Sequence, residues 1–494
     1  MVNMTIIVKS KFKSLEISIL LIILPTIILI TSPIIGQNCY FTANFSTTHS
    51  NWISGFQKTN NGLIIDKASS SIGYQLQWNF TITGDANGVD EGRKLVMDDS
   101  GYLYVGGTIQ QNTSSADLLL VKFNQNGHIL WVRNLSSSGH YWDKGLGLTY
   151  YKNYLYLVGR YYVPGKSYEI AIAKYDTNGN LIWNITWGGI NDDLPQDITA
   201  ENDHIFITGY TKSWGTGLED LIVAKFDLSG NLVWNFTWGT SNTDMGNGII
   251  VKNYDIYVVG QTTISGNYQA TIMRLLDLGT NYSIIWTKTW GGPQNDIGHD
   301  IAMDSNNSIY ITGETSSFGL GNEDVFLSKF TITGVNLWNS TWGDCNSDIA
   351  YGISIDSNDN IFLTGHTKSY AADLYWDLFI LQFDINGNMP WSITWHNGQY
   401  DGGFSTLSLK NSLYATGYTQ AIGGINKNLI VLKYSIPAEH TITSSIPGFG
   451  LGYILLSLLI SVFSLILYDK FKLNNLKLSK SHSYILLNKP IKIQ

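Results

Sequence analysis

The sequence predicts an all-β fold, a seven-bladed β-propeller of four-stranded blades with N-terminal strand closure, followed by a C-terminal transmembrane helix. Three ladders of residues about 52 positions apart, all in phase, carry this prediction. The first ladder is Trp78, Trp131, Trp183, Trp234, Trp286, Trp338 and Trp391. The second is Tyr104, Tyr156, Phe206, Tyr257, Tyr310, Phe362 and Tyr414. The third is Gly107, Gly159, Gly209, Gly260, Gly313, Gly365 and Gly417. Seven copies of a strand-rich unit of this length are typical of propeller blades.

Each unit divides into four short strands, as the copy that starts at Asp348 illustrates. The strands predicted there are residues 352–356, 361–365, 378–384 and 389–395. The first two are joined by Asn-Asp-Asn and the last two by a turn with Asn-Gly, residues that tolerate a left-handed backbone. Pro390 cannot donate to a strand ladder, so it fits an edge strand. The fourth strand is therefore predicted to be the outer edge of the blade.

The strand count predicts how the ring closes. The strand that carries the tryptophan occurs seven times, but its first copy, residues 75–82, precedes any first strand. The last unit ends near Tyr434 without such a strand after it. Residues 75–82 are therefore predicted to complete the last blade, which removes an open edge that would invite aggregation.

These units resemble the SBBP repeat, a seven-bladed β-propeller repeat of secreted bacterial and archaeal proteins. The residues that carry the resemblance are 339–343 (NSTWG), 360–365 (NIFLTG) and 220–227 (DLIVAKFD), with their counterparts in the other units. The resemblance extends over about residues 75–435. It implies the propeller fold and an extracytoplasmic setting, but no catalytic residues.

The N-terminus is predicted to be a signal peptide or an uncleaved anchor, residues 1–36, followed by an extracytoplasmic segment, 37–74. Three lysines precede an apolar run with small residues near its end, which is the signal-peptide pattern. Cys39 and Cys345 lack metal-ligand spacing, and they are predicted to be unpaired thiols, with one bridge between them as the alternative.

The C-terminus is predicted to be a linker (436–448), a transmembrane helix (449–468) and a basic cytoplasmic tail (469–494). The helix segment has 20 residues without a charge, enough to span the hydrocarbon core, and lysines follow it at once. The propeller is thus expected outside the cell, anchored in the cell membrane by a single pass. Pro447-Gly448-Phe449 before the helix resembles the archaeal PGF-CTERM sorting signal, which implies that a sortase-like enzyme removes the helix. A retained helix is the alternative.

Charge and composition limit the classes of partner. Between the two basic ends lie 21 basic and 36 acidic residues, a formal charge of about −15. This charge disfavours nucleic acid and favours cations or basic partners. The oligomeric state is not predicted.

One acidic residue recurs near the start of every unit and predicts a possible Ca²⁺ ring at one mouth of the central channel. These residues are Asp90, Asp143, Asp193, Asp244, Asp296, Asp348 and Asp401. The alternative is that each carboxylate accepts backbone N–H bonds in the loop between two blades. No cofactor other than Ca²⁺ is expected.

Loop aromatics on the same face are candidates for sugar or peptide binding, namely Trp214, Tyr370 and Trp376. The alternative is that they pack the loops together. Sequons outside the repeated position predict glycosylation at Asn44, Asn112, Asn134, Asn281 and Asn306.

The function expected from these features is that of a cell-surface binding, adhesion or scaffold module for a surface glycan or protein. The sequence contains no HExxH pattern, nucleophile elbow or phosphate-binding glycine loop, so no enzyme is predicted. The two alternatives are a passive, cation-bridged structural protein and a quinoprotein-like or carbohydrate-active enzyme.

Overall fold

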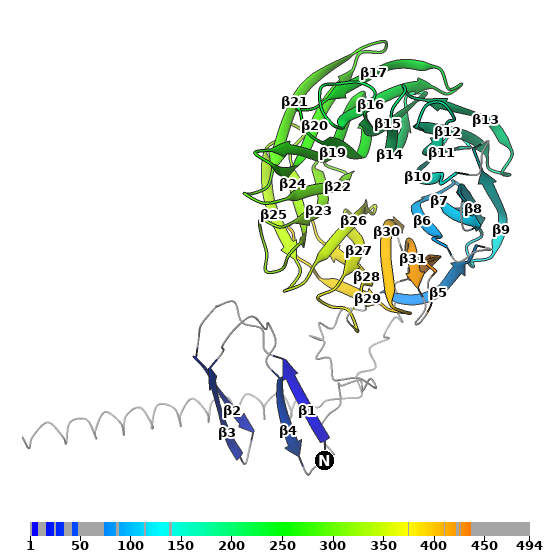
Figure 1. Cartoon of the computed structure of the whole chain (residues 1–494). Helices are drawn as coiled ribbons and strands as arrows, with labels where there is room; N and C mark the ends of the chain where they lie inside the picture. The colour runs from blue at the N-terminus through cyan, green and yellow to red at the C-terminus, as the bar shows by residue number, and fades with distance from the viewer. Residues whose placement is uncertain are drawn as a thin grey trace, which may run out of the picture. The chain divides into compact units, whose positions relative to one another are not determined.

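The computed structural model describes residues 74–84, 88–112, 115–137, 141–373, 375–409, 411–420, 424 and 426–435, together with the backbone of four N-terminal strands. The described residues form seven four-stranded antiparallel sheets arranged around a central axis (Figure 1). The seven-bladed propeller predicted from the ladders is confirmed.

In each blade the strands follow one another from the axis outwards. Blade 1 contains β6 (Glu91–Met97), β7 (Leu103–Asn112), β8 (Ser115–Phe123) and β9 (Ile129–Leu135). Blade 2 contains β10 (Lys144–Tyr151), β11 (Tyr154–Tyr162), β12 (Tyr168–Asp176) and β13 (Leu181–Trp187). Blade 3 contains β14 (Asp193–Glu201), β15 (His204–Thr211), β16 (Asp220–Asp227) and β17 (Leu232–Trp238). Blade 4 contains β18 (Asp244–Lys252), β19 (Asp255–Ile264), β20 (Asn267–Asp277) and β21 (Tyr282–Trp290).

The last three blades repeat this order. Blade 5 contains β22 (Asp296–Met303), β23 (Ile309–Thr315), β24 (Asp324–Phe330) and β25 (Asn336–Trp342). Blade 6 contains β26 (Asp348–Ile355), β27 (Ile361–Thr367), β28 (Asp377–Phe383) and β29 (Trp391–Trp395). Blade 7 contains β30 (Tyr400–Leu409), β31 (Ser412–Gln420), β32 (Asn428–Ser435) and, as its outer strand, β5 (Gln75–Ile82).

The ring closes as the strand count predicts. β5 pairs antiparallel with β32, so that Trp78 lies opposite Lys433 and Phe80 opposite Val431. Two segments that are distant in the chain thus share one sheet. The closure leaves blade 7 with the same four strands as the other blades.

Two strand starts in blade 6 lie two or more residues from the predicted positions. The first strand begins at Asp348 and not at residue 352, because a β-bulge between Ala350 and Gly352 lets the pairing continue towards the start of the unit. The fourth strand begins at Trp391, after Pro390, which has no N–H to donate. The turn prediction is confirmed at Asp359, which has a φ of 61°.

Three tryptophans of the ladder each bond their blade to the backbone of the next. The indole N–H of Trp183 in blade 2 donates to the carbonyl of Leu228 in blade 3 at 3.2 Å. The same bond joins Trp286 to Ile332 (3.1 Å) and Trp338 to Ile385 (3.3 Å). The ring packs over the turn glycine of the next blade, which has positive φ and no side chain to obstruct it.

The glycine ladder marks a close approach between the first two strands of each blade. A Cβ at Gly313 would overlap the carbonyl oxygen of Ile297, which immediately precedes the bulge region of β22. The same overlap occurs at Gly365 with the carbonyl of Ile349. Glycine is therefore required at the ladder position because a side chain there would collide with the backbone of the first strand, and not because the chain turns there.

The hydrophobic core consists of seven clusters, one between each pair of adjacent blades among the described residues. Between blades 7 and 1, Val431 and Leu429 pack with Phe123 and Val121, and Phe80 of β5 covers them. Because no blade buries its own face alone, the stability of each blade depends on both neighbours.

The N-terminal segment contains two strand pairs, β1 (Val2–Ile7) with β4 (Thr42–Thr47) and β2 (Glu16–Ile23) with β3 (Thr26–Pro33). Signal cleavage stays a prediction. The predicted transmembrane helix, 449–468, and the sorting signal lie outside the described residues. Within those residues, no helix has the length and apolar character needed to cross a membrane. Cys345 is disulfide-bonded, so it is not an unpaired thiol, and Cys39 lies outside the described residues.

Candidate functional site

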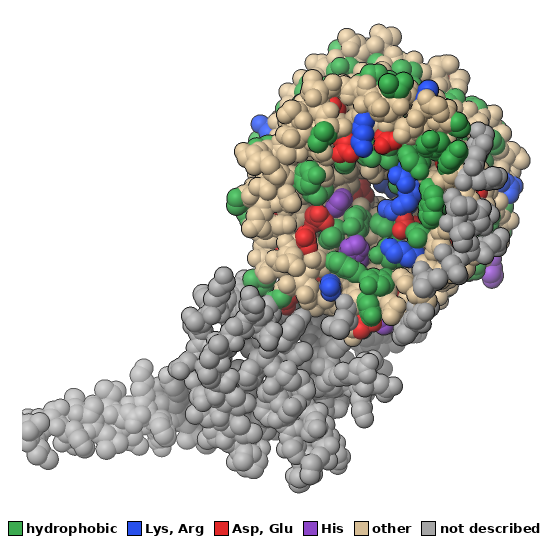
Figure 2. All heavy atoms as spheres, viewed as in Figure 1, with side chains coloured by type: hydrophobic (Ala, Val, Ile, Leu, Met, Phe, Trp, Pro, Cys, Tyr) green, Lys and Arg blue, Asp and Glu red, His purple; other side chains and the backbone are tan. Residues whose placement is uncertain are grey.

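The central channel is lined by the first strand of every blade, and each of these strands carries a β-bulge at the same place. The bulge leaves one residue without a partner in the ladder. The seven bulge residues are Arg93, Leu146, Gln196, Asn247, His299, Tyr351 and Phe404. All seven line one cavity of about 310 Å³ in the channel. Figure 2 shows this hollow, with Lys and Arg, Asp and Glu, and His side chains around it.

In the same cavity, Lys94 pairs with carboxylates from two other blades. Its ammonium lies 3.1 Å from Asp197 Oδ1 and 3.8 Å from Asp300 Oδ2. Burial disfavours the charged lysine, but the two carboxylates outweigh it and raise the Lys94 pKa. Burial is also the main cause that raises the pKa of Asp300. Lys94 therefore links blades 1, 3 and 5 across the channel.

The residues next to the bulge also tie neighbouring first strands together. Asp197 accepts the backbone N–H of Ile249 in the next blade at 3.2 Å. Asp300 accepts that of Ile353 at 3.1 Å. These bonds hold the channel carboxylates in fixed positions, so the lining of the cavity is set by the backbone of the blades.

Three cations contact a single carboxylate at one side of the channel, and a fourth lies next to one of them. Glu91 is 4% exposed and contacts Arg93 at hydrogen-bond distance, Lys144 at 3.8 Å and Lys427 at 4.0 Å. Arg160 lies opposite Lys144 in the strand register. We call these five residues the basic cluster. It has a surplus of positive charge inside a body that is acidic on average.

The electrostatics of the basic cluster reflect this surplus. Burial lowers the pKa of Lys144 to about 8, and the neighbouring Arg93 contributes to the shift. Burial also lowers the pKa of Lys427. Although burial alone would raise it, the pKa of Glu91 is lowered by Arg93, Lys144 and Lys427. The Nε atoms of Arg93 and Arg160 are buried and have no hydrogen-bond partner within the described residues. The positive charges of the cluster thus outnumber its single carboxylate.

Aromatic rings flank the basic cluster and the cavity. The guanidinium of Arg93 lies 3.8 Å from the centre of the Phe404 ring, and the ammonium of Lys427 lies 3.8 Å from that of Tyr418. Tyr351 contacts His299, His366 and Phe404. Burial, with smaller contributions from Lys427 and His299, lowers the pKa of His366 to about 3, so this ring is neutral. The cavity therefore combines charged, amide and aromatic surfaces.

The seven aspartates of the predicted ring are placed together on one face, but their carboxylates are buried in the loops between blades. Each is at most 1% exposed. Asp193 accepts bonds from the N–H of Gly189 and the hydroxyls of Thr211 and Ser213. Asp296 repeats the arrangement with Gly292, Thr315 and Ser317. These bonds hold the loops between blades in place. They match the second interpretation of the aspartates, in which each carboxylate accepts backbone N–H bonds in such a loop. Ca²⁺ at a ring of seven stays a prediction.

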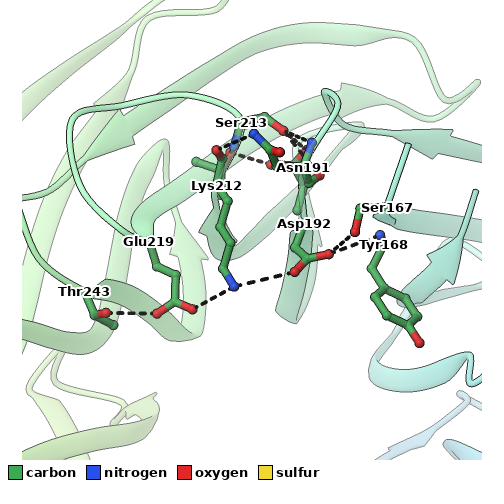
Figure 3. Close-up of polar contacts among 10 residues, drawn as sticks. Ser167, Tyr168, Asn191, Asp192, Lys212, Ser213, Glu219 and Thr243 are labelled. Atoms are coloured by element: carbon green, nitrogen blue, oxygen red, sulfur yellow. Dashed lines mark hydrogen bonds and ion pairs between the residues drawn. The ribbon is translucent and has the colours of Figure 1, made fainter. Parts of the chain in front are cut away.

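A polar network on this face connects blades 2, 3 and 4 (Figure 3). Lys212 lies between Asp192, at 3.5 Å, and Glu219, at 3.3 Å. Glu219 accepts a bond from Thr243, and Asp192 accepts one from Ser167. The loop from β15 to β16, which carries Trp214, is thereby held to both neighbouring blades.

The three aromatic candidates pack against other rings. Trp214 stacks on Trp187 with 5.2 Å between ring centres, and Tyr370 stacks on Trp342 at 4.6 Å. Trp214 nevertheless keeps 40% of its surface exposed. Trp376 packs on His366 at 4.1 Å, and His366 contacts the channel residue Tyr351. The structure does not bring the three together in one site, and ligand binding by them stays a prediction.

Three of the five glycosylation candidates have side chains among the described residues. Asn134, Asn281 and Asn306 are exposed. The side chains of Asn44 and Asn112 lie outside the described residues. Modification of any of the five stays a prediction.

The basic cluster was missed by the sequence analysis. The signal that identifies it is positional: Arg93 stands three residues after Asp90, where the other units have Leu, Gln, Asn, His, Tyr and Phe. Lys144 directly follows Asp143, and Arg160 directly follows Gly159 of the glycine ladder. Aligning the units on their ladders places these residues around one channel.

The comparison with family models agrees with the fold. The family model of the SBBP beta-propeller repeat matches residues 285–319 and 345–370, which confirms the repeat named from the sequence. No curated protein matches the chain.

Solved structures resemble the chain only distantly. A protein of unknown function from Dyadobacter fermentans is 8% identical, with a TM-score of 0.43, over 74% of this chain and 99% of that one. The endosialidase of phage phi92 is 12% identical, with a TM-score of 0.42, over 76% and 71%. Sqt1 from Chaetomium thermophilum is 10% identical, with a TM-score of 0.42, over 70% and 83%. No activity of this chain follows from likenesses at this level.

Proposed function

Since this chain carries SBBP beta-propeller repeats, we propose that it is a membrane-anchored, extracytoplasmic binding module whose ligand site is the central channel. The observation that supports the site best is the basic cluster beside the cavity. Arg93, Lys144 and Lys427 share the one carboxylate of Glu91, and Arg160 adds a fourth positive charge near Lys144. Half-buried charges without enough counter-charge attract an anion, and the channel walls concentrate their field.

The ligand class that fits the lining is an acidic sugar at the end of a glycan. Arg93 and Lys144 match a carboxylate or sulfate group. Gln196, Asn247 and Gln261 offer amides to sugar hydroxyls, and Tyr351 offers a ring face for the apolar side of a sugar. A cavity of about 310 Å³ is at the small end of ligand pockets, so it suits one terminal residue of a longer chain.

The test compares an acidic sugar with its neutral counterpart. We expect the purified protein to bind glucuronic acid, measured by calorimetry, and to bind glucose about tenfold or more weakly, because a charge-assisted hydrogen bond contributes about 1.5–3 kcal/mol. Arg93→Gln and Lys144→Gln should each weaken binding of the acid by a similar factor.

Lys152→Gln is the matched control, because Lys152 is an exposed lysine in a turn of blade 2 and its removal changes the net charge equally. Equal affinity for both sugars, or an equal loss in Lys152→Gln, would count against the channel site. No binding by the folded protein to any acidic sugar on a glycan array would remove this ligand class.

The proposed location rests on the apolar and basic segments at the two ends of the sequence. Protease added to intact cells should release a fragment of propeller size, because the blades would be outside and tethered near residue 449. Immunoblotting with an antibody to the propeller measures this. Protection in intact cells together with digestion after lysis would contradict the proposed topology.

A further inference from the structure

One position at the blade interfaces distinguishes the repeats from one another. It follows the second tryptophan of the outer strand and is occupied by Gly188, Gly239, Gly291, Gly343 and His396 in blades 2 to 6. At each, two side chains approach: one from the start of the third strand of the same blade, and one from the ring aspartate of the next blade. These interfaces differ in how the resulting negative charge is balanced.

Between blades 6 and 7, the chain supplies its own cation. His396 Nδ1 lies 2.7 Å from Asp377 Oδ1 and 3.9 Å from Asp401 Oδ2. Asp377 is 1% exposed and Asp401 is fully buried. The imidazole therefore lies between two buried carboxylates.

Two other interfaces avoid a pair of free carboxylates. Between blades 2 and 3, Glu169 forms an ion pair with Lys166. Between blades 4 and 5, the third-strand residue is the neutral Gln269, whose amide donates to the carbonyl of Gly292 at 2.8 Å. A charge is thus either paired or absent at these places.

The interface of blades 3 and 4 has two buried carboxylates, Asp220 (2% exposed) and Asp244 (fully buried), and only glycine where His396 stands in blade 6. A Cβ at Gly239 would overlap Asp220 Oδ1 and lie 2.9 Å from Asp244 Oδ2. A Cβ at Gly217 would lie 2.7 Å from the carbonyl oxygen of Thr240 and 3.3 Å from Asp220 Oδ1. Carboxylate and carbonyl oxygens thus converge on one small region.

The interface of blades 5 and 6 repeats this arrangement with Asp324 (1% exposed) and Asp348 (fully buried). A Cβ at Gly343 would overlap Asp324 Oδ1 and lie 2.9 Å from Asp348 Oδ2. Asp324 Oδ1 is buried and has no hydrogen-bond partner within the described residues. Asp344, which is 5% exposed, lies beside the pair and donates its N–H to Asp348.

No ion pair within the described part of the chain joins a Lys, Arg or His to Asp220, Asp244, Asp324 or Asp348. Two buried carboxylates without a counter-ion are costly, since each charge loses its hydration and repels the other. From the cation at the equivalent place in blade 6 and the unpartnered Asp324 oxygen, we propose that Asp220–Asp244 and Asp324–Asp348 each bind one Ca²⁺ between two blades. Ca²⁺ is the fitting ion because it accepts carboxylate and backbone carbonyl oxygens in irregular geometry, whereas Mg²⁺ keeps several waters.

This assignment differs from a ring of seven equivalent aspartates. Among the ring aspartates of blades 3 to 7, only those that face a second, unpaired carboxylate bind an ion, and the ion lies between blades and not in the channel. Asp296 serves as the control for the ring position, because it occupies that position but faces the neutral Gln269 and not a second carboxylate.

The experiment is equilibrium dialysis of radioactive Ca²⁺ against the purified full-length protein, at about 10⁻⁴–10⁻³ M, the range typical of extracellular modules. Asp324→Asn and Asp220→Asn should each lower the bound Ca²⁺ by one ion per chain. Asp296→Asn should leave it unchanged. His396→Gly removes the internal cation and should add one ion per chain.

Thermal melting gives a second readout that does not depend on the aspartate variants folding. The melting temperature of the unaltered protein should rise with Ca²⁺ and fall when a chelator is added, and His396→Gly should show the larger rise. Absence of Ca²⁺ binding by the folded, unaltered protein overturns the proposal. An equal loss of ions in Asp296→Asn and Asp324→Asn overturns the pairing and returns the site to a uniform ring.

Discussion

Replacing Gln75–Ile82 by eight Gly and Ser residues is expected to abolish cooperative folding of the propeller. β5 is the outer strand of blade 7, and it covers a core in which Leu429 and Val431 are completely buried. Phe80 contacts Phe123 with 5.7 Å between ring centres, and Trp78 contacts Tyr414 at 6.1 Å. A fully buried aromatic contributes about 3–5 kcal/mol. Trp78 and Phe80 are half-buried, and their loss adds to the loss of pairing with β32, against the roughly 5–15 kcal/mol typical of a whole domain.

The measurement is urea unfolding followed by tryptophan fluorescence, with light scattering to detect association through the exposed edge of β32. The control changes only the exposed residues Gln75, Gln77 and Asn79 to Thr, which keeps the strand and should leave the midpoint within experimental error. A synthetic peptide of residues 74–83 should restore the transition by adding back the strand. If the Gly/Ser chain unfolds at the same urea concentration as the unaltered chain, blade 7 does not need β5.

Lys225→Met should destabilise the protein by about 3–5 kcal/mol, because it leaves a buried carboxylate without its partner. Lys225 Nζ lies 2.7 Å from Asp277 Oδ2, and the two side chains are 1% and 2% exposed. The same ammonium donates to the carbonyl of Gly279 in the next blade at 2.9 Å, and Trp234 donates its indole N–H to Asp277 at 3.2 Å. The pair thus lies at the contact of blades 3 and 4.

A double-mutant cycle separates the pair from its surroundings. Lys225→Met combined with Asp277→Leu should recover much of the lost stability, since replacing both buried charges by apolar groups is often neutral. The exposed pair Lys152–Asp203, with side chains 56% and 61% exposed, is the comparison, and Lys152→Met should cost less than about 1 kcal/mol. Similar losses at the two lysines would show that burial does not decide the effect.

The strands and the ring closure could be predicted because they depend on local periodicity. Trp338, Tyr310 and Gly313 recur at fixed spacing; the glycine contact recurs in every blade and the tryptophan bond in three of them. The boundary at Asp348 could not be predicted, because a β-bulge extends the strand without a change in hydrophobic pattern.

The candidate site could not be predicted because it is assembled from one residue per unit. Arg93 and Phe404 are 311 positions apart in the sequence, yet the guanidinium of Arg93 lies over the Phe404 ring. Such a contact has no local signature, whereas the ring aspartates do, and for that reason the sequence analysis favoured them. Their bonds to loop N–H groups arise from the same regularity that made them conspicuous.

The bulge in each first strand has an evolutionary consequence. It releases one residue per blade from the strand ladder, and that residue lines the cavity in the channel. The seven released positions hold seven different residue types, while the core between the blades is rebuilt from the same few apolar residues each time. The residues that line the cavity and the residues that form the core therefore occupy different positions of each repeat. These seven positions are therefore the place where substitutions change the lining of the cavity most and the core between the blades least.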